Sequence, residues 1–396
     1  MPLEPDTICT STQETNAGRP NLVAPELTQH YANMGWVGYV RMTSDKLGAN
    51  NLLRVTGADI NLSQEIIKPD VIDGRIDPTV YQLGPKIVEG TLTMPLIADT
   101  QDPSQWTDND CPELEDLTGV ASSVLNNVWC WATARDSQGR LSYDDTTLQV
   151  RYANHAGFTF TNCVVNEYTI SVAQQDMVST DINVIGRGRS MSETSTGSPT
   201  YALYPDFGDF LSPARVFTWN DVTVNGLRGC RLNGQHLFYS NQVREFSITI
   251  NNNADRFYTL CGSLFPVDVN VGKREITGSL TLMGLQERLR DLAVSNPERF
   301  TEKNELRLAF YLGNDAYNEN TGTFTSRDWT DNLNDASHLG AVWSKRIQGV
   351  VFEIEEMSMT NEVFETTVNY HAMGDDQSGY EAFTPQTSGN YPAWGE

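Results

Sequence analysis

The chain has few cysteines, and none of them form the close pairs that bind metal or carry redox chemistry. Its six cysteines are spread over 396 residues without a C-x-x-C motif. Neither a zinc site nor a thioredoxin-like site is therefore indicated, since both need closely spaced thiols. The sequence predicts buried free thiols instead.

Positive charge is also scarce. The chain has 27 Lys and Arg against 51 Asp and Glu, which gives a formal net charge of -24. Tight binding to nucleic acid phosphates needs clustered Lys and Arg, so the composition excludes a protein that holds DNA by its backbone. Solubility is an equally ordinary reason for a strongly acidic surface, and this reading stays open at the level of composition.

Long apolar runs are missing. No stretch comes near the length of about 18 uncharged apolar residues that a membrane-spanning helix needs. The first ten residues, M-P-L-E-P-D-T-I-C-T, lack the basic end and apolar run of a signal peptide. We therefore expect a chain that is made in the cytoplasm and is not inserted in a membrane.

Catalytic and metal-binding motifs are lacking too. The five histidines are scattered, with no H-x-x-x-H pair, and neither a P-loop nor a G-x-S-x-G or G-x-G-x-x-G motif occurs. Acidic clusters lack the ordered spacing of a calcium-binding loop. The sequence predicts a protein that is not an enzyme and uses no metal or cofactor. Glycoside hydrolysis stays open, because it depends on the distance between two carboxyl groups, which only a fold defines.

The sequence contains an internal repeat. Two blocks match at a shift of 188 residues and two more at a shift of 186: 58–64 with 246–252, 88–94 with 276–282, 164–168 with 350–354, and 179–188 with 365–374. A fixed internal period indicates a repeated structural unit, and this period is too long for a solenoid repeat. Two copies of one domain are therefore expected.

Repeat and composition together divide the chain into five segments. They are an N-terminal arm (1–34), copy one (35–188), a linker (189–214), copy two (215–374) and a C-terminal arm (375–396). A chain of this length can form two domains with full cores.

Within each copy, segments that alternate apolar and polar residues outnumber helical ones. Strands are expected at 53–62, 87–96, 129–134, 148–152, 164–172 and 177–185 in copy one, and at 243–251, 276–283, 306–312, 341–357 and 363–370 in copy two. One helix is expected in each copy, at 114–127 and 285–295, and a β-bulge at 353–359. The prediction is a mainly β chain with minor α: two tandem β-sandwich or partial-barrel domains, each flanked by a helix.

Alternation along the strands separates an apolar face from a polar one, because successive side chains of a strand point to opposite sides. The polar face holds acids, amides and hydroxyls in both copies and contains no Lys or Arg. The candidate functional residues on this face are Asp59, Asn61, Glu89, Thr91, Glu167, Thr169, Asp181, Asn183, Glu245, Thr249, Glu275, Thr277, Glu365 and Thr367. Exposed strand faces usually mix both signs of charge, so a face without cations is unusual.

The order of these elements resembles the tail tube proteins of long-tailed bacteriophages, which share a fold with the tubes of contractile injection machines. The resemblance rests on V-E-G-T-L-T-M and I-T-G-S-L-T-L, the helix that follows each block, and the closing hairpins that end in N-V-I-G and N-Y-H-A-M-G. It covers about 35–188 and 215–374. The family carries hairpins that join neighbouring domains into a closed β-barrel around a channel, so the resemblance implies that the polar face lines this channel.

The resemblance implies further roles. The long segment between the first two strands, 64–85, would stack one ring on the next through Lys68, Asp70, Asp73, Arg75, Asp77 and Tyr81. A typical member has one domain and forms rings of six, so a chain with two copies implies homotrimeric rings. The implied location is the virion tail, after assembly in the host cytoplasm. The implied partners are other copies of the chain, a tail sheath, baseplate and tail terminator proteins, and double-stranded DNA that passes without specific binding.

A different class of function remains open at this point. The chain could be a carbohydrate- or receptor-binding β-sandwich protein of a virion baseplate or adhesion device. Aromatic side chains can stack on sugar rings, and the candidates are Trp106, Trp129, Trp131, Tyr201, Tyr204 and Trp219. A hydrolase on a β scaffold is a third alternative, without a motif to support it. Assembly separates these classes, since only a tube protein forms rings or polymers.

Overall fold

The computed structural model describes 15 segments of the chain. They are residues 38–47, 49–68, 81–98, 124–135, 140–152, 156–192, 215–228, 235–238, 240–260, 263–284, 304–311, 317–318, 323–324, 341–359 and 364–372. The two expected terminal arms, most of the expected linker and the helix expected at 285–295 lie outside these residues.

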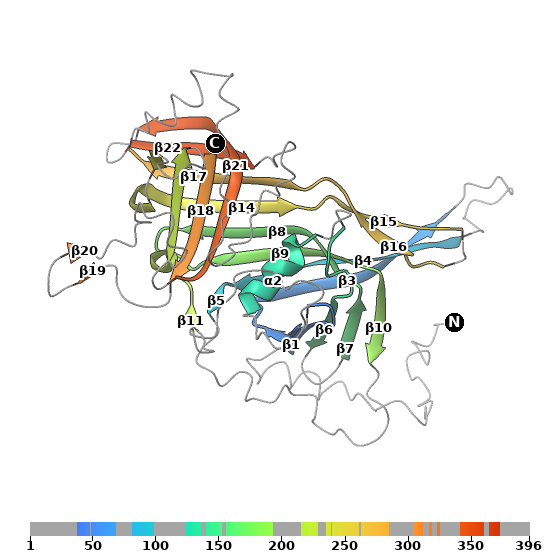
Figure 1. Ribbon diagram of the computed structural model, residues 1–396. Coiled ribbons are helices and arrows are strands. Elements are labelled where there is room, and N and C mark those ends of the chain that lie inside the picture. Colours follow the sequence, from blue (N-terminus) through green and yellow to red (C-terminus); the bar gives the residue numbers. More distant parts are fainter. Residues whose placement is uncertain are drawn as a thin grey trace, which may run out of the picture.

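Two antiparallel sheets make up most of the fold (Figure 1). The small sheet has five strands in the order β10 (Gly188–Ser192), β7 (Ala156–Thr161), β6 (Thr147–Tyr152), β1 (Gly38–Ser44) and β2 (Ala49–Leu53). The large sheet has eleven, in the order β13 (Gln235–Phe238), β12 (Val222–Arg228), β18 (Asn304–Tyr311), β21 (Ala341–Met359), β22 (Phe364–Ala372), β17 (Glu275–Met283), β14 (Val243–Asn251), β8 (Val164–Ala173), β9 (Ser179–Gly186), β4 (Gln82–Pro95) and β3 (Gly57–Ile67).

Short elements complete the described chain. Three strand pairs stand apart from the sheets: β5 (Ile97–Ala98) with β11 (Arg215–Val216), β15 (Ala254–Phe257) with β16 (Asp268–Val271), and β19 (Tyr317–Asn318) with β20 (Thr323–Phe324). The helices are α2 (Val124–Thr133) and two single turns, η2 (Trp219–Asp221) and η3 (Ser240–Gln242). None of the described helices is long and apolar enough to cross a membrane.

The fold class predicted from the sequence, mainly β with minor α, is confirmed. Strand β14 begins and ends where it was expected, and β8 and β22 differ from their expected bounds by at most two residues. The register of β21 against β22 shifts between Ile354 and Glu356, so the expected bulge is present. These strands could be predicted from the sequence because one of their faces is buried, so apolar and polar residues alternate strongly along them.

Several elements differ from the prediction. The strands expected at 53–62 and 87–96 are β3 (Gly57–Ile67) and β4 (Gln82–Pro95), and no strand was expected at β1, β7, β12 or β13. Of the helix expected at 114–127, only the part from Val124 onward lies in the described residues, where α2 begins. Residues 129–134 were expected to form a strand, but α2 continues to Thr133. The segment is buried around its whole circumference, and a short apolar run of this kind has no periodicity that separates a helix from a strand. The expected linker begins with a strand, since β10 pairs with β7 from Gly188 to Ser192.

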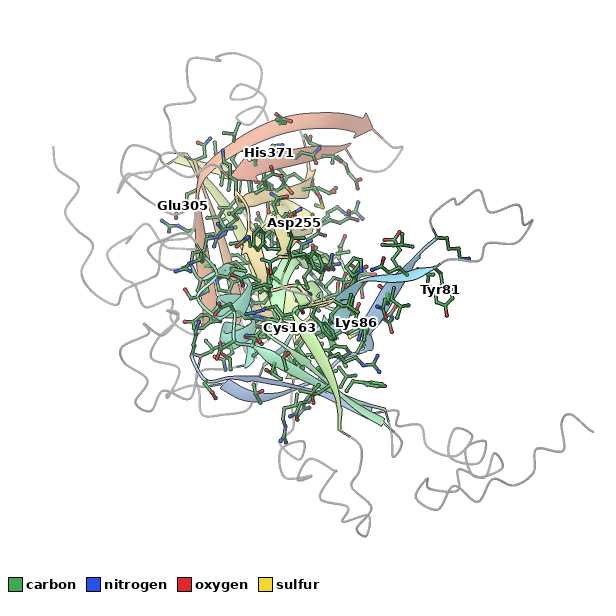
Figure 2. The ribbon with its side chains drawn as sticks, turned by 90° about the vertical axis from the view of Figure 1, so that its right-hand side faces the viewer. Tyr81, Lys86, Cys163, Asp255, Glu305 and His371 are labelled. Atoms are coloured by element: carbon green, nitrogen blue, oxygen red, sulfur yellow. The ribbon has the colours of Figure 1, made fainter. Side chains whose placement is uncertain are left out.

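The core includes buried residues of both sheets and of α2, which packs on β8 of the large sheet and on β2 of the small sheet. The rings of Trp129 in α2 and Tyr168 in β8 pack edge to face, with their centroids 5.9 Å apart. The rings of Phe246 and Tyr370 are stacked, with their centroids 6.4 Å apart. Cys163 is a fully buried free thiol, as expected, and burial raises its pKa to about 12 (Figure 2). The expectation of free thiols is wrong for Cys130, which is disulfide-bonded.

The large sheet contains the same strand order twice. The group β3-β4-β9-β8 is followed directly by β14-β17-β22-β21. Each group consists of two hairpins, and in each the later hairpin lies beside the second strand of the earlier one. The two groups are joined edge to edge through β8 and β14, so one continuous sheet crosses both halves of the chain.

Candidate functional site

One face of the large sheet is lined by the polar residues that alternation predicted. Cross-strand pairs place them in rows, because residues directly opposite each other share a face. One row runs Asp59, Thr91, Asn183, Glu167, Asn251 and Glu275; the next runs Thr93, Asp181, Thr169, Thr249, Thr277 and His371. Glu245 lies opposite Thr281, which lies opposite Thr367, and Glu365 and Asn61 extend the pattern on β22 and β3. All 14 candidate residues therefore share one face, which we call the polar face.

Hydroxyl groups hydrogen-bond to each other across this face. Thr169 and Thr249 lie 3.0 Å apart across the β8–β14 junction. Ser171 contacts Ser179 at 2.8 Å, and Ser247 contacts Ser279 at the same distance. In these three pairs, each hydroxyl has its hydrogen-bond partner on the face itself.

The carboxylates of the polar face differ in their surroundings. Glu89 pairs with Arg256 of β15 at 2.5 Å, and Glu365 pairs with Arg244 of β14. Five other carboxylates of this face are exposed and form no ion pair among the described residues: Asp59, Glu167, Asp181, Glu245 and Glu275. Two arginines thus reach a face that was expected to hold no cation, and both sit at its ends.

Sequence reasoning missed both arginines for identifiable reasons. Arg244 sits at a register shift between Val243 and Glu245, where period-two counting assigns it to the wrong side. Arg256 belongs to a separate hairpin that folds back across the strand ends. The first error could have been found only by expecting a bulge at the start of β14.

The other candidate residues are placed as follows. Lys68 and Tyr81 of the expected stacking segment are exposed, whereas Asp70, Asp73, Arg75 and Asp77 lie outside the described residues. Of the candidate sugar-stacking aromatics, Trp129 and Trp131 are buried in the core and cannot meet a ligand, while Trp219 is exposed. Trp106, Tyr201 and Tyr204 lie outside the described residues. In the described segments no group of three or more His, Cys, Asp or Glu side chains could hold a metal ion.

The two halves meet in an ordinary antiparallel register. Strand β14 pairs with β8 over seven residues, from Glu245 opposite Ala173 to Asn251 opposite Glu167. This junction joins two different edges, the last strand of the first group and the first strand of the second. A contact between unlike edges can repeat head to tail from one unit to the next.

The two four-stranded groups together form eight neighbouring strands, β3-β4-β9-β8-β14-β17-β22-β21, hereafter the eight-strand run. The same two kinds of edge recur at the ends of this run. Strand β3 is the terminal strand of the sheet and pairs with β4 alone in the part of the chain that the structure describes. Strand β21 pairs with β18 through its residues up to Val350 and with β22 from Val350 onward. Its segment 351–359 therefore has one edge without a described partner. Such edges are templates for pairing with another chain.

The connection between β14 and β17 clamps the second half onto the first. Asn252 is fully buried and donates to the carbonyls of Ala132 at 2.9 Å and Val165 at 3.0 Å, and its own oxygen accepts from Arg135 at 3.2 Å. Arg274 donates to the carbonyl of Thr133, so cationic and amide donors cover the carboxyl end of α2.

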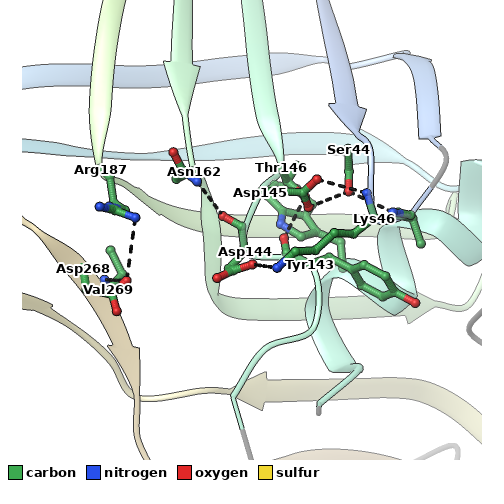
Figure 3. A network of polar contacts seen from close by, with 12 residues as sticks. Ser44, Lys46, Tyr143, Asp144, Asp145, Thr146, Asn162, Arg187, Asp268 and Val269 are labelled. Carbon is green, nitrogen blue, oxygen red and sulfur yellow. Dashed lines mark hydrogen bonds and ion pairs between the residues drawn. The ribbon is translucent and has the colours of Figure 1, made fainter. Parts of the chain in front are cut away.

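The hairpin β15–β16 extends this contact across the strand ends of the first half. Arg256 reaches Glu89 and the carbonyl of Val88, and the amide of Lys86 donates to the carbonyl of Leu264 at 2.8 Å. Arg187 lies just after β9, and its Nη1 is 4.0 Å from Oδ1 of Asp268 (Figure 3). The connection therefore crosses β8 and β9 and ends on β4.

Replacing Asn252 with alanine is expected to lower the free energy of unfolding by about 3 kcal/mol, because buried carbonyls of Ala132 and Val165 lose their donor. Urea unfolding followed by circular dichroism measures the change. The control is Asn270→Ala, at an exposed position of β16, which should shift stability by less than about 0.5 kcal/mol. Equal effects of the two changes would contradict a clamping role for Asn252.

A comparison with family models places this geometry in a known group. Residues 37–283 match the model of a family described as phage tail tube protein. The matched range includes the first four-stranded group and ends with β17 of the second. A search of curated proteins found no match. Since the family model covers more than half of the chain, the chain belongs to the phage tail tube protein family and is a structural component of a phage tail.

Proposed function

We propose that three copies of this chain close into a ring, that rings stack into the tail tube, and that the polar face lines the channel through which DNA leaves the virion. The observation that carries this proposal is the junction of β8 with β14. It joins the two halves of one chain through unlike edges, and edges of the same two kinds end the eight-strand run. A second chain can therefore continue the sheet by repeating a contact that already exists within each chain.

The internal repeat supplies the register of this contact between chains. Asp59 corresponds to Ser247, and Ser358 corresponds to Ser171, because Ser358 pairs with Glu365 as Ser171 pairs with Ser179. Ser247 and Ser171 are direct partners at the internal junction. Asp59 of one chain is therefore expected opposite Ser358 of the next. By the same reasoning Leu62 lies opposite Ile354, and Asn61 lies opposite Glu356.

The bulge in β21 affects this register. Because Glu355 is the extra residue between Ile354 and Glu356, the correspondence with β8 shifts from 186 to 187 residues beyond it. Without this correction, every residue after the bulge would be assigned to the wrong face.

The charge of the polar face suits a channel for DNA. Pairing of phosphates with Lys or Arg would hold DNA in place, whereas exposed carboxylates repel it over roughly a Debye length of about 8 Å at physiological salt. Three pairs of hydroxyls between the carboxylates are hydrogen-bonded to each other. Few hydrogen-bond donors therefore remain that could bind bases or phosphates. Ring stacking would fall to the outer part of the segment between β3 and β4, which includes Asp70, Asp73, Arg75 and Asp77.

A cysteine pair tests ring closure directly. The variant Asp59→Cys with Ser358→Cys is expected to form disulfides between chains under mild oxidation, because directly opposite residues have Cα atoms about 4.5 to 5.5 Å apart, within the range for a disulfide. Denaturing gels without reductant should show a covalent species of three chains, and electron microscopy should show rings with a central hole.

The internal junction provides the matched control. Ser171→Cys with Ser247→Cys places two cysteines at the equivalent pair, where Ser171 and Ser247 are direct partners, and should crosslink within one chain without an increase in mass. The buried Cys163 should not interfere, since a thiol with a pKa of about 12 supplies little thiolate. A control that crosslinks, together with an Asp59/Ser358 variant that stays a single chain, would refute the proposed ring.

A further inference from the structure

The hairpin of β3 and β4 carries exposed apolar side chains toward its outer end. Ile66, Ile67, Tyr81 and Leu83, hereafter the hairpin patch, are 54%, 46%, 72% and 48% exposed. Figure 2 shows Tyr81 far out on this hairpin. Ile66 and Ile67 are neighbours in one strand, so the patch covers both faces of the hairpin. A two-stranded ribbon with apolar side chains on both faces gains stability only by packing against another surface.

The connection between β14 and β17 is the counterpart of this hairpin in the second half of the chain. At a shift of 188, residues 63–87 align with 251–275 without a gap. Glycines and prolines coincide at Gly74 and Gly262, Pro78 and Pro266, and Gly84 and Gly272; polar residues of the same type coincide at Gln64 and Asn252, Lys68 and Arg256, and Lys86 and Arg274. The two connections thus share their length, their glycine and proline positions and several polar residues.

The counterpart is docked, whereas the hairpin patch is exposed. The β14–β17 connection crosses β8 and β9 and reaches β4 through Arg256, as described above. Val269 and Val271 of β16, which take the places of Tyr81 and Leu83, are half-buried. Ala254, in the place of Ile66, is half-buried as well, whereas Asp255, in the place of Ile67, is exposed. The docked state therefore covers three of the four positions that the first half leaves exposed.

We propose that the outer end of the described β3–β4 hairpin, formed by 64–68 and 81–86, docks sideways on the second half of the neighbouring chain in the same ring. This inference rests on the proposed ring. The occupant is a second copy of this chain, because among the described residues the counterpart docks on the four-stranded group joined to its own first strand. For β3, that group is β14-β17-β22-β21 of the neighbour, in which β21, β22 and β17 take the places of β8, β9 and β4.

The repeat identifies the contact residues. Arg256 binds the carbonyl of Val88 and the carboxylate of Glu89. The corresponding positions on β17 are Ile276 and Thr277, and Lys68 takes the place of Arg256.

The charges fit this placement. Glu275 is exposed and lies on the same face as Thr277, two residues away. Lys68 is exposed as well, and no ion pair involves either side chain among the described residues. A lysine on a flexible four-carbon stem can reach this carboxylate.

Chemical crosslinking between chains tests the docking. The variant Lys68→Cys with Thr277→Cys is treated with a short bismaleimide, both as single rings isolated by sedimentation and as stacked tubes. Crosslinks between chains are expected in the single rings. The matched control is Arg256→Cys with Glu89→Cys, which should crosslink within one chain, and the unaltered protein measures the background from native thiols.

The outcomes separate sideways docking from ring closure and from stacking. Crosslinks that form only in tubes would place the outer end of the described hairpin between rings and overturn the inference. Absence of crosslinks in rings whose Asp59/Ser358 pair still joins chains would overturn the docking while leaving the ring intact. Failure of both pairs, with both internal controls crosslinked, would overturn the ring and the docking together.

Removal of the patch provides a second measurement. Ile66→Ser with Leu83→Ser should raise the chain concentration at which half of the protein is assembled into rings, by about tenfold or more. The reason is that assembly of this variant removes less apolar surface from water. Met177→Ser, which alters an apolar side chain of similar exposure on the β8–β9 turn, should leave that concentration unchanged. Equal concentrations for the patch variant and the unaltered protein would overturn the docking.

Discussion

Replacing Gly278 with alanine is expected to abolish stable folding of the chain. A Cβ atom at this position of β17 would lie 2.2 Å from the carbonyl oxygen of Ser247 and 2.3 Å from the Tyr370 ring. The Tyr370 hydroxyl donates to the same carbonyl at 2.8 Å, so neither neighbour can move without the loss of this partly buried hydrogen bond. Overpacking that shifts backbone in a core costs about 3 kcal/mol or more. Soluble yield and the urea midpoint measure the effect.

Gly57 supplies the matched control for this change. A Cβ atom at Gly57 meets only Thr93, at 3.8 Å, so Gly57→Ala should leave stability within about 0.5 kcal/mol. Gly90, the counterpart of Gly278, is equally crowded, since its Cβ would lie 2.0 Å from the carbonyl of Asp59. Normal yield of the Gly278→Ala protein would mean that β14 and β17 lie farther apart than the structure places them.

Reversing the charge of the polar face should slow DNA delivery while tubes still assemble. The variant Glu167→Lys, Asp181→Lys and Glu245→Lys changes three carboxylates that have no ion pair among the described residues. Glu89 is kept because it binds Arg256, and Glu275 is kept because it faces Lys68 in the proposed docking. Lysines along the channel would bind phosphates, so the rate of DNA ejection is expected to fall about tenfold or more at low salt and to recover as salt rises. Ejection from purified virions that carry the variant measures the rate.

A neutral variant distinguishes attraction of DNA from loss of carboxylates. Glu167→Gln, Asp181→Asn and Glu245→Gln removes the repulsion without adding cations, and its ejection rate should stay within a factor of about three of the unaltered protein. If the lysine variant assembles tubes and ejects DNA at the normal rate at low salt, the polar face does not line the channel.

Alternation and the internal repeat made most of the large sheet predictable. Strands such as β8 and β14 have one buried and one polar face, so a period of two marked both their position and their faces. Helix α2 was misread at Trp129 because burial on all sides removes any period. Strand β10 was missed because G-R-S-M-S has the composition of a linker, and its pairing with β7 depends on a contact distant in sequence.

The sequence by itself determined the strands, their polar face, the repeat and the scarcity of cations, because these depend on the order of residues along the chain. Only the tertiary structure decided which edges meet. It joined β8 to β14, left β3 and the end of β21 as edges, and brought Arg256 onto Glu89. Such pairings depend on how far the chain folds back on itself, and residues 167 positions apart leave no local pattern.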